Sequence, residues 1–273
     1  MENRSLISKR YLKILMFFIL SILLSWLLWL TPLLKSLGIR LSDPLLIFGQ
    51  FATLGPFLAA LIITGMSEGR QGVKRLFRSC WDWRFSHIWL AVIILLPFTV
   101  TGLSIAIKNF IQGGQFQWGI SPAAIPVTMV MIFFVGGPLE EVGWRGVALP
   151  LLLKKVSPIR ASLILGTMHG IWHLPLHFID GTVQSSMPFW EFLLATIVGS
   201  IMYTWIYIGT KGSLTAVILY HWLSNTASAL FVYWDTDLGR WIFFIIECIA
   251  ALLIIIIDKK RMLGLYQNRR CEQ

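Results

Sequence analysis

Charged residues are scarce in this sequence. Only 13% of its 273 residues are charged and 56% are hydrophobic, which gives a mean hydropathy of +0.74. Soluble globular domains usually carry about 25% charged residues. The scarcity of charge therefore excludes an ordinary water-soluble globular protein.

Cysteine is also scarce, and its spacing is uninformative for metal binding. Cys80, Cys248 and Cys271 lie far apart, and no C-x-x-C pair occurs. This pattern indicates neither a disulfide framework nor a structural zinc cluster, so free thiols are expected.

The net charge of +10 would suit a nucleic-acid-binding protein, but the sequence has neither a dense basic tract nor an RNA-binding motif. The lysines and arginines fall instead in short segments between hydrophobic runs. No nucleic acid is therefore expected as a partner, whereas membrane lipid is.

The sequence contains several long hydrophobic runs. About 20 apolar residues are needed to cross a hydrocarbon layer roughly 30 Å thick. The runs predict an all-α, polytopic membrane helical bundle that forms one transmembrane domain over residues 1–273. The eight predicted transmembrane helices are 14–34, 45–66, 88–107, 123–153, 159–179, 189–208, 213–233 and 242–257.

The basic residues predict how this bundle is oriented. Of the 23 lysine and arginine residues, 18 fall on one side of the predicted spans, four fall on the other, and Arg145 lies within a span. Such a bias places both termini in the cytoplasm, and the membrane is the plasma membrane if the cell is prokaryotic. The basic segment from Arg70 to Arg84 is either an ordinary cytoplasmic loop with interfacial tryptophans or a surface for an anionic leaflet or a partner.

Seven polar residues lie inside apolar spans, where burying a polar side chain is energetically unfavourable. A charged side chain at mid-span costs about 3 kcal/mol on insertion scales. Glu141 and Arg145 are four residues apart in the favourable acid-first order, so we expect them to pair, whereas Glu140 points elsewhere on a helix. The seven residues are Glu140, Glu141, Arg145, His169, His173, His221 and Asn225.

These residues also share a depth. At about 1.5 Å per residue, Glu140, His173 and Asn225 lie roughly 20 Å from the predicted cytoplasmic ends of three different spans, and His221 lies about 15 Å from its end. Unrelated core residues would reach one level only by chance. The spacing therefore predicts one polar site within the membrane.

The span 123–153 is too long for a single straight crossing. Gly136, Gly137 and Pro138 lie in its middle, so we expect a break there, with a new helix that starts near Pro138. Glu140 and Glu141 then fall in its first turn, where the helix dipole favours carboxylates.

This residue set suits hydrolysis of an amide by water. An ionised glutamate beside a neutral imidazole can take a proton from water, and a histidine with an asparagine amide can stabilise an oxyanion. The sequence has no G-x-S-x-G elbow, no second buried aspartate and no H-E-x-x-H motif, which disfavours serine, aspartyl and zincin-type mechanisms. A zinc site built from His173, His221 and Glu140 is the alternative to metal-free catalysis.

Three motifs now resemble one family. Glu140, Glu141 and Arg145 match E-E-x-x-x-R, His173 ends a segment like F-x-x-x-H, and His221 with Asn225 matches H-x-x-x-N. Their order resembles that of the CAAX prenyl protease and bacteriocin-processing family of intramembrane endopeptidases. The resemblance covers roughly residues 123–233, the predicted catalytic core.

The resemblance implies a function for each motif residue. Glu140 and His173 would activate water, Glu141 and Arg145 would support the site, and His221 and Asn225 would stabilise the oxyanion. Family members are classed as metalloproteases, although a metal-free glutamate mechanism is also proposed, so no cofactor is the first expectation and zinc the second. The implied substrate is a membrane-associated protein or peptide, such as a prenylated C-a-a-X protein.

One position departs from the family motif, and two other functions remain open. His169 stands where the motif has an aromatic residue, and is either a packing substitute or an added polar group. The main alternative function is a non-catalytic membrane immunity or scaffold protein of the same fold. A proton-coupled transporter is the other, but the spans show no paired inverted halves.

Overall fold

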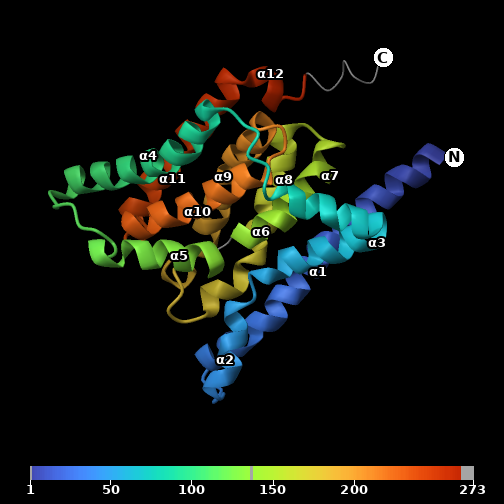
Figure 1. The fold of residues 1–273 in the computed structure, drawn as a ribbon. Coiled ribbons are helices and arrows are strands. Elements are labelled where there is room, and N and C mark those ends of the chain that lie inside the picture. The colour runs from blue at the N-terminus through green and yellow to red at the C-terminus, as the bar shows by residue number, and fades with distance from the viewer. Residues whose placement is uncertain (1, 136–137, 266–273) are drawn as a thin grey trace.

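A computed structural model describes residues 2–135 and 138–265, and all regular elements in that part of the chain are helical. Figure 1 shows an elongated bundle in which α1 forms one side and α4 and α11 lie on the other. The longer helices are α1 (Glu2–Ser36), α2 (Asp43–Gln50), α3 (Leu54–Ser79), α4 (His87–Gln112), α5 (Ile125–Val135), α8 (Pro158–Trp172), α9 (Phe189–Gly209), α10 (Leu214–Leu230) and α11 (Asp237–Ile257). The shorter elements are η1 (Pro122–Ala124), α6 (Pro138–Gly143), η2 (Trp144–Ala148), α7 (Leu149–Leu153), η3 (Leu174–Phe178), η4 (Gln184–Ser186) and α12 (Lys259–Met262).

The predicted helical membrane bundle is confirmed, although the count of eight spans stays a prediction. Within the described residues, five segments are long and apolar enough to cross a membrane: Tyr11–Ser36, His87–Gln112, Pro122–Leu153, Phe189–Gly209 and Asp237–Ile257. The other three predicted spans are also largely helical, and the run 213–233 contains the unbroken α10 of 17 residues. The run 45–66 is divided between α2 and α3, and the run 159–179 leaves the α-helix after Trp172.

Glycine allows the helices around the centre to approach closely. A methyl group at Gly166 of α8 would come within 2.7 Å of the Ile197 Cα of α9. One at Gly143 of α6 would collide with the Pro56 carbonyl of α3. Small residues at such contacts are the usual means of packing helices in a membrane, where no hydrophobic force draws one helix to another. These contacts hold α6 and α8 in the middle of the bundle.

The long span that carries the glutamates contains two α-helices on either side of the predicted break. Helix α5 ends at Val135 and α6 begins at Pro138, near the predicted start of the new helix, while the break itself, at Gly136 and Gly137, lies outside the described residues. Glu140 and Glu141 occupy the first turn of α6. The chain then winds through a π-helical segment, η2, before α7, and such segments are frequent at functional sites.

The structure tests the prediction of free thiols at two of the three cysteines. Cys80 and Cys248 are both free, which confirms the prediction for them, whereas Cys271 lies outside the described residues.

Candidate active site

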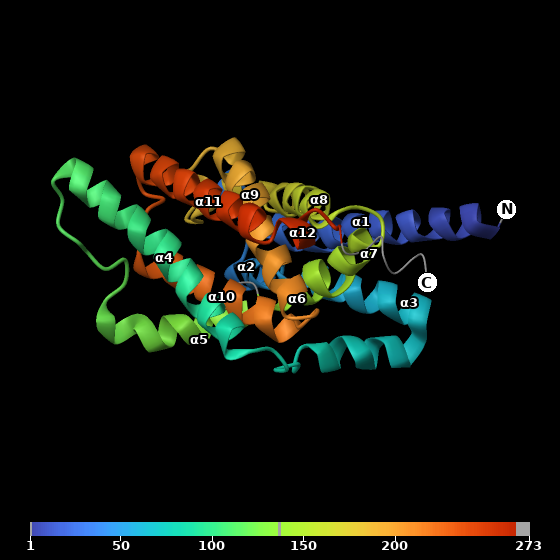
Figure 2. The same ribbon diagram turned by 90° about the horizontal axis from the view of Figure 1, so that it is seen from above.

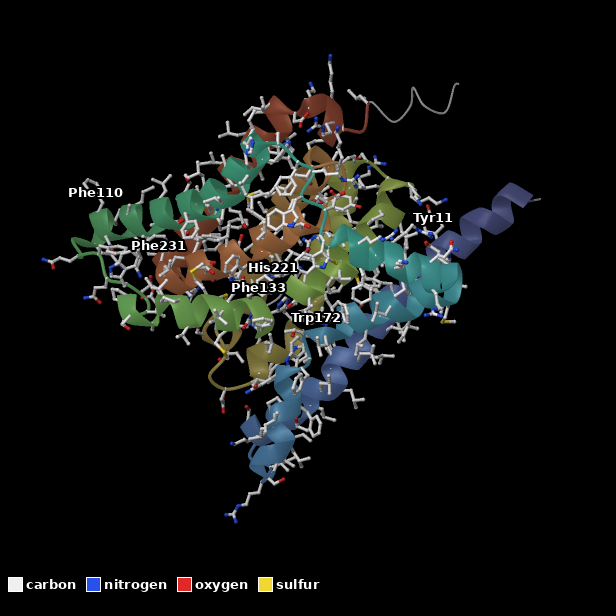
Figure 3. All side chains as sticks on the ribbon, viewed as in Figure 1. Tyr11, Phe110, Phe133, Trp172, His221 and Phe231 are labelled. Carbon is white, nitrogen blue, oxygen red and sulfur yellow. The ribbon has the colours of Figure 1, made fainter. Side chains whose placement is uncertain are left out.

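A cavity of about 640 Å³ lies inside the bundle, and its walls come from α6, α8, α9, α10 and α11. Five of the predicted site residues line it, together with His169. In Figure 3 the labelled His221 and Trp172 both lie near the middle of the molecule. The five are Glu140, Arg145, His173, His221 and Asn225.

The two adjacent glutamates point to different partners. Glu140 Oε2 lies 3.1 Å from His169 Nε2 of α8. Glu141 Oε1 accepts hydrogen bonds from Arg145 Nη1 at 2.9 Å and from His221 Nδ1 at 2.7 Å. Both glutamates are buried, with 4% of Glu140 and none of Glu141 exposed. The predicted pairing of Glu141 with Arg145, and the separate direction of Glu140, are confirmed.

Arg145 is held on two sides. Its guanidinium pairs with Glu141 and lies over the Tyr203 ring of α9, 4.2 Å from the ring centroid. Only 1% of Arg145 is exposed, so the pair is shielded from solvent. Removing one partner of such a buried pair leaves an uncompensated charge, and the pair therefore fixes α6, α9 and α10 relative to one another. Tyr203 was not predicted, because no spacing in the sequence links it to the glutamates.

His173 is oriented by its own helix. Its Nδ1 donates a hydrogen bond to the carbonyl oxygen of His169 at 3.0 Å, and the ring packs against Trp172 and Phe192. A carbonyl can only accept, so Nδ1 carries the proton and Nε2 is left with a lone pair in the neutral ring. His173 can therefore accept a proton or bind a metal through Nε2.

His221 and Asn225 lie one turn apart on α10 and both line the cavity. Because His221 uses Nδ1 to reach Glu141, Nε2 is the nitrogen left for a ligand. Ser224 and Ser228 of the same helix also line the cavity. The face of α10 that the sequence predicts to be polar is thus the face that lines the cavity.

His169 has both of the roles that were left open for it. Its ring packs 5.1 Å from Trp144 and 4.9 Å from His173 between centroids, as an aromatic substitute would. Its Nε2 also contacts the Glu140 carboxylate. The spacing of four residues from His173 was the only sequence signal for this second role.

A possible metal site differs by one residue from the predicted set. Glu140, His169 and His173 each offer one ligand atom, and these atoms lie within 4.8 Å of one another. Two imidazole nitrogens and a carboxylate oxygen make up a catalytic zinc set. His221, named in the predicted set, is instead bonded to Glu141, so the geometry groups His169 in its place.

Comparison with known proteins finds similarity over this part of the chain. The model of the Rce1-like family, described as type II CAAX prenyl endopeptidases, matches residues 122–227, a range that includes every motif residue from Glu140 to Asn225. A relative named CAAX prenyl protease 2, from Methanococcus maripaludis, is 25% identical over 261 residues, or 90% of this chain and 94% of the relative. Both comparisons find similarity to CAAX prenyl endopeptidases.

These similarities support the view that the protein is a CAAX-type endopeptidase, a hydrolase of peptide bonds. It is also a multi-pass membrane protein, in keeping with its apolar helices. The assignment of individual catalytic roles stays a prediction from the motifs and from the cavity.

Proposed function

We propose that this chain is an intramembrane endopeptidase in which Glu140 and His173 activate water against a peptide bond. The observation that carries the proposal is that both side chains line one cavity and offer a carboxylate oxygen and an imidazole nitrogen within 4.8 Å of each other.

The reaction needs one proton to move twice. Water between Glu140 and His173 Nε2 loses a proton to one of them as its oxygen bonds to the scissile carbonyl carbon. The same proton then passes to the amide nitrogen as the C–N bond breaks, which releases an amine and a carboxyl product. His169 Nε2 holds the Glu140 carboxylate at 3.1 Å and limits its rotation.

His221 and Asn225 are proposed to stabilise the oxyanion of the tetrahedral intermediate. Since His221 Nδ1 already donates to Glu141, a second donation from Nε2 requires the doubly protonated ring. The Asn225 amide supplies a neutral donor from the same helix face. Glu141 and Arg145 are positioning residues, because they hold His221 without needing to contact the substrate.

The donor set also fits a divalent metal. Glu140, His169 and His173 would hold the ion, and a bound ion would supply Lewis-acid polarisation of water or of the carbonyl. Zinc content and activity can be measured together on protein purified without chelator and after dialysis against one. If catalysis is metal-free, activity should persist when the protein contains far less than one zinc ion per chain.

The proposed substrate is a membrane-associated protein or peptide with a prenylated C-a-a-X end. The relative from Methanococcus maripaludis is named for that chemistry, and a largely apolar cavity within lipid-facing helices suits a lipid-modified chain. We further propose that both termini are cytoplasmic, because 18 of 23 basic residues fall on that side. Accessibility labelling of single cysteines placed near each terminus tests this orientation.

The decisive experiment uses purified protein in liposomes with a farnesylated C-a-a-X peptide. Mass spectrometry of the products should show release of the terminal tripeptide by the wild type and not by Glu140→Gln. Glu247→Gln is the matched control, since it makes the same change at another buried glutamate that lines the cavity. Equal cleavage by the wild type and Glu140→Gln would refute the mechanism, and an unmodified peptide cleaved as fast would refute the prenyl requirement.

A further inference from the structure

Helix α3 contains a sharp bend whose backbone only glycine adopts readily. Gly69 has φ of 63° and ψ of −163°, a region that is essentially restricted to glycine. The bend divides α3 into a first arm, residues 54–68, and a second arm, residues 70–79. Figure 2 shows the two arms running in different directions. We call this feature the α3 elbow.

A hollow lies at the α3 elbow, and both arms contribute to it. Gly65 comes from the first arm, and Val73 and Phe77 from the second give apolar walls. Arg70 and Lys74, four residues apart and hence on one helix face, add two positive charges to the same hollow. A site with an apolar wall and a pair of cations fits an amphipathic anion.

The two cations of the hollow are not neutralised by the protein. Across the bend, Arg75 pairs with Glu68 at 2.8 Å, and farther along the chain Arg84 pairs with Asp82 at 2.8 Å. Arg70 and Lys74 form no ion pair within residues 2–135 and 138–265. Both are exposed, so their charge is available to an external anion.

The surroundings of the α3 elbow match the boundary between hydrocarbon and headgroups. On the first arm, Ile62 and Met66 are exposed apolar residues that lead up to the bend. Beyond the second arm, Trp81 and Trp83 are exposed, and tryptophan concentrates at membrane interfaces. The second arm keeps Leu76 buried while its charged side chains face outward, as a helix lying in the interface does.

We propose that the α3 elbow binds an anionic phospholipid. The phosphate lies against Arg70 and Lys74, the glycerol region fills the hollow beside Phe77, and an acyl chain follows Ile62 and Met66 along the first arm. Apolar residues on both sides of the cations favour a lipid over free phosphate, which would use only the charges. This site is separate from the cavity that holds Glu140 and does not depend on the proposed function.

Native mass spectrometry of the full-length protein, titrated with phosphatidylglycerol, tests the proposal. Arg70→Gln combined with Lys74→Gln should weaken the tightest lipid binding about 30-fold, since each basic residue near an anionic surface contributes about fivefold. The matched control is Arg78→Gln with Arg84→Gln, which removes the same charge from the same segment but not from the hollow. It should lower affinity less than about threefold.

Two further measurements separate the lipid site from general charge attraction. Gly69→Ala keeps every charge but disfavours the bend, and should weaken binding as strongly as the double variant. Phosphatidylcholine and millimolar inorganic phosphate should not displace the bound lipid. Equal losses in the double variant and its control, or displacement by phosphate alone, would overturn the proposal. If Gly69→Ala does not fold, the double variant and its control decide.

Discussion

Two regions of this membrane protein bury glutamates, and they differ in what surrounds them. Glu140 and Glu141 on α6 meet a histidine, an arginine and a second histidine that come from other turns and other helices. Glu247 on α11 is equally buried, at 6% exposed, and lines the same cavity. Its Oε2 has no hydrogen-bond partner within the described residues.

The difference teaches that burial of an acid does not by itself make an active site. Both regions carry the desolvation cost of a carboxylate in an apolar setting. Only on α6 do hydrogen-bond partners offset part of this desolvation cost, and they also fix the direction of the carboxylate oxygens. Glu247 lies close to Gly199 of α9, where a methyl group would come 2.8 Å from Oε1. Four variants test this contrast.

The largest effect is expected at Glu140. Glu140→Gln keeps the shape of the side chain but removes the base, and should lower the rate of peptide cleavage by about 10²- to 10⁴-fold. The measurement is initial rate in liposomes, with protein amount and thermal stability checked in parallel. A variant that accumulates normally and retains more than a tenth of the wild-type rate would contradict the assigned role.

Arg145 should affect stability most. Arg145→Met leaves Glu141 with only His221, and should destabilise the folded protein by about 3–5 kcal/mol, because a buried carboxylate loses its guanidinium. Unfolding in mixed micelles with increasing denaturing detergent measures this loss. Exposed Arg75, paired with Glu68 at the α3 elbow, provides the comparison, and Arg75→Met should cost less than about 1 kcal/mol.

His169 should give an intermediate effect. His169→Phe restores the aromatic residue of the motif and keeps the packing against Trp144, but it removes the contact with Glu140. Cleavage should fall about 10- to 100-fold, as for other residues that orient a reacting group, while thermal stability changes little. If the wild type binds zinc, the zinc content of His169→Phe should fall together with its cleavage rate. Full activity with unchanged zinc content would assign His169 to packing alone.

Glu247 should give the smallest effect. Glu247→Gln removes a buried acid whose Oε2 has no hydrogen-bond partner within the described residues, so cleavage should stay within about twofold and stability should be unchanged or rise by about 1 kcal/mol. The same rate and unfolding assays apply. A loss comparable to that of Glu140→Gln would mean that Glu247 belongs to the machinery and that the contrast drawn above is false.

Much of the site was predictable because helices convert spacing into direction. The interval of four residues from Glu141 to Arg145 predicted their pair, and the offset between neighbouring residues predicted that Glu140 would face elsewhere. The common depth of Glu140, His173 and Asn225, which stays a prediction, rests on a fixed rise per residue in the same way. Local geometry is sufficient for each of these inferences.

The contacts between helices were less accessible from the sequence. His169 rather than His221 lies against Glu140, and Tyr203 covers Arg145, although no spacing relates α6 to α8 or α9. The bend at Gly69 was also missed, because a glycine in a helical run is compatible with a straight helix, and its φ is set by how the two arms pack.

By itself, the sequence determined that the chain is a helical membrane protein and which of its residues are costly in lipid, whereas their common depth stays a prediction. Hydrophobicity and helical rise act locally along the chain, so these properties can be read from spacing. Only the tertiary structure decided which imidazole faces which carboxylate and that the cavity connects them. Those pairings depend on the rotation and approach of helices that are distant in sequence, which close packing at glycines such as Gly143 and Gly166 sets.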